Sequence, residues 1–208
     1  EEHGKKLQKV SVTTTLYEDL NECRQILTDA LVTWNEKVDR SLIDEGVQKI
    51  LDRLPFIRVA EDRGIEPPTL TPMVREWQAS KGKILLYQSM ISKFHELDRI
   101  YDSNLFQAHS SDNWEEHTEA VKKVIGILYG QEGYYEYDFK LIPADVLGAV
   151  YEGYLSYKLS TVQGKKTLFG EENKVVVSKD AKKRKEQGIY YTPMFIVDYI
   201  VKNALKPV

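Results

Sequence analysis

The segment Gly-Ile-Tyr-Tyr-Thr-Pro near the end of the chain combines groups that could hold a small molecule with a carboxylate. Gly188 permits a turn that other residues resist, and Tyr190 and Tyr191 place two aromatic faces beside it. Thr192 can cap a helix through its hydroxyl, and Pro193 suits the first helical position, where no amide hydrogen is needed. The free amides of that helix start would attract an anion. The segment is therefore the candidate binding element of the chain.

A purely structural interpretation accounts for the same residues. A Thr-Pro pair is a common start for a helix, and the apolar spacing that follows predicts an amphipathic helix over residues 193–205. In this interpretation the two tyrosines belong to the core and the segment binds nothing. From residue types alone we favour the structural interpretation, because one short motif seldom identifies a site by itself.

The segment also resembles the one just upstream of the catalytic core in gamma-class DNA adenine-N6 methyltransferases. The resemblance is strongest to fused restriction-modification enzymes of the type IIG and single-polypeptide type I kinds. In that family a Gly-x-Tyr-Tyr-Thr-Pro element, motif X, lines the S-adenosylmethionine pocket, and Gly188 here matches its glycine. The resemblance implies that Tyr191 and Thr192 line the methionine end of the cofactor. It implies that Pro193 fixes the helix start and that Tyr190 packs behind.

Three other stretches fit the same family in the same order. Residues 138–155 resemble the leading helix that precedes motif X, and residues 48–65 resemble a helix near the start of the family's helical connector. Residues 101–106 fit a weaker pattern. Each stretch is loose by itself, but the ordered combination extends over most of residues 16–205.

Two catalytic elements of that family do not occur in the sequence. They are a glycine loop after the first strand and an Asn/Asp-Pro-Pro-Tyr/Phe tetrapeptide. The chain ends at Val208, where that strand is expected, and starts at Glu1 without an initiator methionine. We therefore expect a piece of a longer protein, with no catalytic residues and no methyltransferase activity of its own.

The resemblance implies what the intact protein does. It would transfer a methyl group from S-adenosylmethionine to adenine N6 in duplex DNA, with the target base flipped out of the helix. A nuclease domain would lie upstream and the rest of the methyltransferase downstream, so the intact protein could also be an endonuclease. This piece would hold part of the cofactor pocket without binding the cofactor tightly. The alternative is a non-enzymatic helical module for protein–protein interaction.

Composition narrows the possible partners. The net charge of −3 is not that of a strongly basic DNA-binding domain, so DNA contacts would need a local patch or other parts of the protein. The lone Cys23 cannot form an internal disulfide, which fits a reducing cytoplasm. The sequence has no signal peptide and no apolar run long enough to span a membrane, so we predict a cytoplasmic protein without membrane contact.

Charged residues in the second predicted helix could suggest a nuclease or a metal site. They are Asp52, Arg53, Arg58, Glu61, Asp62 and Arg63. We favour ion pairs within the helix, because arginines are interleaved with the carboxylates. The four histidines lack metal-ligand spacing, and we predict no metal site: His3, His95, His109 and His117. His95 is expected on a helix flank.

Three groups of residues keep two interpretations each. The basic run Lys182–Lys185 could contact DNA phosphates or could simply be solvated. An aromatic cluster could stack on bases, but packing into a core is favoured: Tyr134, Tyr135, Tyr137 and Phe139. On the leading helix, the resemblance implies that Tyr151 and Glu152 brace the methyltransferase core, which we favour over a direct ligand role for Glu152.

Apolar periodicity predicts a mainly α fold that positions these groups. The predicted helices cover residues 15–38, 42–63, 83–100, 113–128, 143–158 and 193–205. Pro55 is expected to kink the second helix, residues 66–72 form a loop rich in helix breakers, and residues 160–178 form a β-hairpin or flap.

These elements suggest four regions along the chain. Residues 1–14 are a disordered or artificially added lead, and residues 15–130 form the helical connector domain. Residues 131–187 hold the leading helix and the flap or linker. Residues 188–208 begin a truncated α/β methyltransferase domain, and the apolar side chains of its helix should be under-buried: Phe195, Ile196, Tyr199, Ile200 and Leu205.

Overall fold

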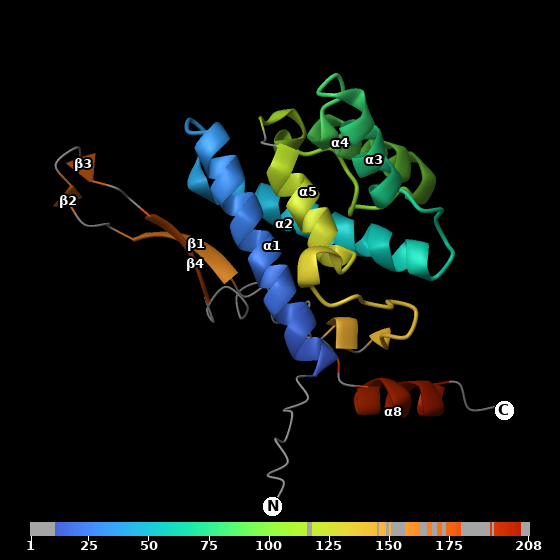
Figure 1. The fold of residues 1–208 in the computed structure, drawn as a ribbon. Coiled ribbons are helices and arrows are strands. Elements are labelled where there is room, and N and C mark those ends of the chain that lie inside the picture. The colour runs from blue at the N-terminus through green and yellow to red at the C-terminus, as the bar shows by residue number, and fades with distance from the viewer. Residues whose placement is uncertain are drawn as a thin grey trace, which may run out of the picture.

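The computed structural model shows a mainly α protein, as the sequence predicts (Figure 1). It describes residues 11–115, 118–144, 146–148, 150, 157–162, 166–167, 170–171, 174–179, 192 and 194–204. The helices are α1 (Val12–Trp34), α2 (Arg40–Asp62), α3 (Leu70–Ser80), α4 (Leu86–Tyr101), α5 (Thr118–Leu128) and α8 (Met194–Ala204). Two short 3-10 turns are η1 (Ser110–Asn113) and η2 (Gln131–Gly133).

Capping residues set the starts of the first two helices. The side chain of Ser11 accepts a hydrogen bond from the amide of Thr14 at 3.2 Å, so α1 begins three residues earlier than the apolar pattern indicates. Asp39 accepts from the amide of Ser41 at 2.8 Å and starts α2. Helix α1 ends at Trp34, short of the predicted residue 38.

One proline lies where the prediction has it and the other does not. Pro55 lies inside α2, which runs to Asp62 within one residue of the predicted end, and the kink expected at Pro55 stays a prediction. Pro72 is the third residue of α3, where an amide has no acceptor within the helix and its loss costs little. The predicted loop over residues 66–72 is therefore wrong at its end, and α3 was missed because Pro72 belongs to its first turn.

The hydrophobic core lies between α1, α2, α4 and α5. Helix α5 contacts each of the four preceding helices, and Figure 1 shows it between α1 and the α3–α4 pair. Leu27, Ile50, Phe94 and Val124 are each fully buried there, and so is the lone Cys23. The core also takes in side chains that follow α5: Tyr137, Phe139, Ile142 and Val150.

The later helices differ from the prediction mainly at their ends. Helix α4 covers 86–101 rather than 83–100, and α5 covers 118–128 rather than 113–128, with η1 at residues 110–113. Residues 144, 146–148 and 150 of the leading helix are helical, but residues 157 and 158 belong to a strand. None of the described helices has the length and apolarity needed to cross a membrane.

A β-hairpin follows the leading helix and confirms the prediction for residues 160–178. Strands β1 (Tyr157–Val162) and β4 (Lys174–Lys179) pair antiparallel, from Tyr157 opposite Lys179 to Val162 opposite Lys174. The short strands β2 (Lys166–Thr167) and β3 (Gly170–Glu171) pair farther along the same hairpin (Figure 1). Strand β4 contacts α1 and strand β1 contacts α2, so the base of the hairpin lies against the helices.

Helix α8 exposes its apolar side chains, as the sequence predicts. Phe195 is 73% exposed and Tyr199 is 70% exposed, and Ile196 and Ile200 are exposed as well. Leu205 lies outside the described residues. In Figure 1, α8 lies apart from the bundle of α1 to α5.

Candidate functional site

Of the five predicted cofactor residues, the structure describes one. Thr192 is exposed and lies two residues before α8, outside any helix or strand. The other four lie outside the described residues: Gly188, Tyr190, Tyr191 and Pro193. The same holds for Lys182–Lys185 and for Tyr151 and Glu152. The assignment of this element to S-adenosylmethionine stays a prediction.

The charged residues of α2 form one ion pair of the predicted kind. Arg58 pairs with Asp62 one turn later. For Arg53 and Arg63 the prediction of pairing within the helix is wrong, because both side chains donate to carbonyl groups of segments far along the chain. Glu61 accepts from the amides of Thr69 and Leu70 and caps α3. Among the described residues no group of three or more His, Cys, Asp or Glu could hold a metal ion.

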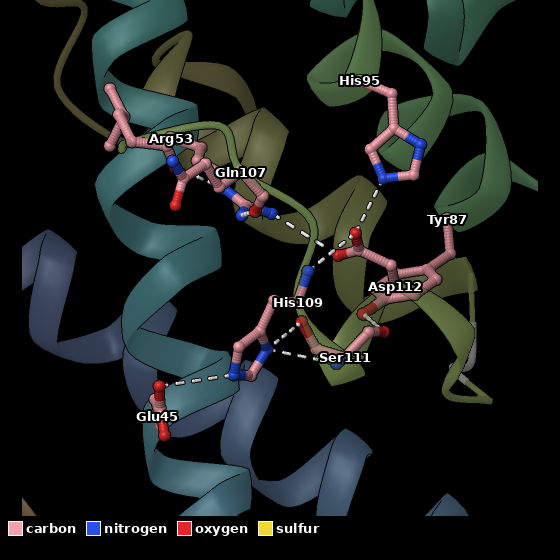
Figure 2. Close-up of polar contacts among 9 residues, drawn as sticks. Glu45, Arg53, Tyr87, His95, Gln107, His109, Ser111 and Asp112 are labelled. Atoms are coloured by element: carbon pink, nitrogen blue, oxygen red, sulfur yellow. Dashed lines mark hydrogen bonds and ion pairs between the residues drawn. The ribbon is translucent and has the colours of Figure 1, made fainter. Parts of the chain in front are cut away.

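Arg53 belongs to a polar cluster that joins α2, α4 and the loop containing η1 (Figure 2). Its side chain is fully buried and lies 5.0 Å from the ring centroid of Phe94. It donates to the carbonyl oxygen of Leu105 at 2.9 Å and to that of Gln107 at 2.5 Å. Burial lowers the pKa of the Arg53 guanidinium, while the carboxylate of Asp112, 3.5 Å away, acts in the opposite direction. The buried cation is thus held by two backbone carbonyls and one carboxylate.

Asp112 links this cation to α4. Its Oδ2 lies 2.7 Å from Nε2 of His95 and accepts from the amide of His109 at 3.1 Å. The side chain of His95 is 47% exposed, which confirms the predicted position on a helix flank. The carboxylate of Asp112 is only 5% exposed, so Arg53 and His95 approach it from two sides of a buried position.

His109 orders the other end of the same loop. Its Nδ1 accepts from the amide of Ser111 at 3.1 Å and so caps η1, while its Nε2 lies 3.5 Å from a carboxylate oxygen of Glu45. The hydroxyl of Tyr87 donates to the carbonyl of Ser111 at 2.7 Å. Beside this loop, the ring of Trp114 packs against the backbone of α2 at Gly46. Together these contacts fasten residues 105–114 onto α2 and α4.

The geometry of this cluster indicates a structural role. A buried carboxylate that orients a half-exposed imidazole is an arrangement that general bases use. Here, however, Asp112 also neutralises a buried arginine and accepts from a backbone amide, so its carboxylate is committed to holding the loop. Sequence reasoning missed the cluster because Arg53 and Asp112 are 59 positions apart and no local pattern connects them.

The aromatic residues after α5 pack into the core or against it, which confirms the favoured prediction for Tyr134, Tyr137 and Phe139. Tyr137 and Phe139 are buried, whereas Tyr135 is half exposed. The hydroxyl of Tyr137 donates to Asp19 and that of Tyr134 donates to Glu22, both at 2.5 Å. The hydrogen bond to Glu22 raises the pKa of Tyr134 to about 12. Burial, followed by the bond to Asp19, raises the pKa of Tyr137.

Comparison with known proteins points to one class of enzyme. No protein-family model matches the chain, and no solved structure matches it. Over 203 residues, 96% of this chain, it is 23% identical to the Escherichia coli protein "Type II restriction enzyme and methyltransferase RM.Eco57I". The chain spans 18% of the length of that protein. The similarity supports a relationship with restriction-modification enzymes.

Proposed function

We propose that this chain is a helical connector, with the first element of a methyltransferase domain, from a restriction-modification protein that methylates adenine N6 in DNA. The observation that carries the proposal is the similarity to a combined restriction enzyme and methyltransferase over 96% of the chain. That extent includes the Gly-x-Tyr-Tyr-Thr-Pro element, which resembles motif X of adenine methyltransferases. The intact protein would act in the cytoplasm on duplex DNA and take its methyl group from S-adenosylmethionine.

The exposure of α8 supports the proposal. A helix with apolar side chains around most of its circumference is stable only when other parts of a protein cover it. Phe195 and Tyr199 are both mostly exposed, and Val201 is exposed as well. In the proposed protein, the remaining methyltransferase domain covers this surface, and Thr192 at the start of the helix faces the cofactor.

The helical body would act as a spacer in this protein. Helices α1, α2, α4 and α5 share one continuous core, which gives a stiff unit between a nuclease upstream and the methyltransferase downstream. A spacer needs no strongly basic surface, in agreement with the net charge of −3. The alternative function, a module that binds only other proteins, would leave the motif X element as an ordinary helix cap.

The Thr192→Ala variant of the intact protein tests the proposed site. Loss of one hydrogen bond to the charged methionine end of the cofactor should weaken S-adenosylmethionine binding about tenfold, measured by calorimetry. The control is Ser92→Ala, which removes an exposed hydroxyl from α4. In a plain interaction module, Thr192→Ala would only cost about 1 kcal/mol of stability. Unchanged cofactor affinity in the Thr192→Ala protein would refute the site assignment.

A further inference from the structure

Residues 134–142 carry the chain from the helical bundle toward the leading helix, the hairpin and α8. Apart from turns, this segment forms no helix or strand. Its backbone groups therefore lack the regular partners of a helix or a ladder, and other groups must hold it in place. In the structure these groups include side chains of α1 and α2 and that of Arg63, which follows α2, so the direction of the segment depends on a few specific contacts.

The pair formed by Arg58 and Asp62 makes the central contact. Asp62 accepts from the amide of Phe139 at 2.9 Å, and Arg58 donates to the carbonyl of Tyr137 at 3.4 Å. Arg58 also donates to the carbonyl of Leu128, the last residue of α5, at 3.4 Å. One ion pair on α2 thus contacts both the end of α5 and the middle of the segment.

Aromatic rings enclose the cation of this pair. The guanidinium carbon of Arg58 lies 4.3 Å from the ring centroid of Tyr129 and 5.6 Å from that of Phe139. Arg58 is only 8% exposed, so its attraction to the rings and to Asp62 is weakly screened by water. A planar guanidinium can stack on rings and donate to carbonyls at the same time, which a lysine cannot do.

Further contacts hold the two ends of the segment. Tyr134 and Tyr137 donate to carboxylates on α1, as described above. Arg63, which follows α2, donates to the carbonyl of Ile142 at 3.2 Å. The segment is therefore held at its start, its middle and its end, and Arg58 with Asp62 joins its middle directly to the end of α5.

We propose that the Arg58–Asp62 pair is the joint that fixes the direction in which the chain leaves the helical body toward the methyltransferase domain. The two are positioning residues. The proposal rests on the proposed function for its meaning in the intact protein, but the rigidity of the joint can be measured in this chain without reference to any activity.

Spin labels on this 208-residue chain test the joint directly. The Ser92→Cys and Ala144→Cys changes place labels at exposed positions on α4 and just beyond the segment, and the buried Cys23 is shielded from the reagent. Pulsed electron resonance then gives the distribution of label-to-label distances. With Arg58→Met we expect a distribution about twofold broader than in the parent chain. The control is Arg75→Met, which changes an exposed arginine on α3.

A second variant distinguishes loss of the joint from unfolding of the whole chain. Arg58→Lys keeps the charge beside Asp62 but loses the planar fork, so we expect a smaller broadening with the helix content unchanged by circular dichroism. If the Arg58→Met protein does not fold, the distance distribution of the Arg58→Lys protein decides whether the joint exists. Distributions as narrow as that of the control in every folded variant would overturn the proposal.

The intact protein separates this proposal from the proposed function. Wild-type protein that fails to methylate DNA would refute the proposed function, while the label distances would still decide whether the joint exists. If the wild type methylates and cleaves, Arg58→Lys should methylate normally but cut at more scattered distances from its methylated base. Equal loss of both activities would indicate general destabilisation and count against the joint.

Discussion

Helices α4 and α8 both carry large apolar side chains, but α4 buries most of them and α8 exposes them. In α4, Phe94 and Leu97 are fully buried and the exposed positions are mostly polar or charged. In α8, Phe195 and Tyr199 are more than two-thirds exposed. An amphipathic helix such as α4 already specifies which side faces the core. A helix that is apolar on most sides needs apolar surface from elsewhere, which the proposed methyltransferase domain would supply.

The sharpest test of this comparison is to truncate one phenylalanine in each helix. Phe94→Ala should lower the free energy of unfolding of this chain by about 3–5 kcal/mol, because it leaves a cavity in the core. Phe195→Ala should change it by less than about 0.5 kcal/mol, because that ring is mostly in water. Urea unfolding followed by circular dichroism measures both. Similar losses for the two variants would show that α8 packs onto the helical body in solution.

A smaller effect is expected from a methyl group added at Gly46 in α2. The added carbon would lie 2.6 Å from the ring of Trp114 and 3.0 Å from the side chain of Ser111, so the fastened loop would have to move. We expect Gly46→Ala to lower the free energy of unfolding by about 1–3 kcal/mol, although alanine favours helices.

Gly126 in α5 gives a matched control for that variant. A methyl group added at Gly126 would have the side chain of Gln131 as its nearest neighbour, at 3.4 Å, which is an ordinary contact. Gly126→Ala should therefore leave stability unchanged or raise it by up to about 1 kcal/mol. If Gly46→Ala lowered the free energy of unfolding no more than Gly126→Ala does, the helical body would be less tightly packed around Gly46 than the comparison with α8 implies.

The smallest effect concerns pH. The pKa of Tyr134 is raised to about 12 from a reference value of 10.0 by its bond to Glu22. The folded state therefore holds this proton more tightly than the unfolded state. Its contribution to stability is complete below pH 10 and is lost as the pH rises through 12. Thermal unfolding across this range should show a shallower decline for Tyr134→Phe, and an identical decline would contradict the bond to Glu22.

Local signals in the sequence predicted the helices because each depends on neighbours close along the chain. Apolar spacing located α2, α4 and α5 to within a few residues, and β-prone residues between glycines located the hairpin. The failures also have local causes. Ser11 extends α1 through a cap that lies before the apolar pattern, and Pro72 looks like a helix breaker until it is counted within the first turn of α3.

The polar cluster around Arg53 could not be predicted, because its partners come from distant parts of the chain. Arginines that alternate with carboxylates along a helix suggest ion pairs within that helix, and Arg58 does pair with Asp62 one turn later. Arg53 does not, because it faces the core and must find partners among the segments that pack there. The motif X residues stay predicted: of these, the structure describes Thr192.

The reactivity of the buried Cys23 thiol can be used to measure how often the helical body opens. Cys23 is the chain's one cysteine, it is fully buried in α1, and burial raises the pKa of the thiol. At neutral pH it is therefore both protonated and shielded, and an alkylating reagent can reach it only when α1 separates from its neighbours. The rate of alkylation under native conditions therefore measures how often the helical bundle opens around α1.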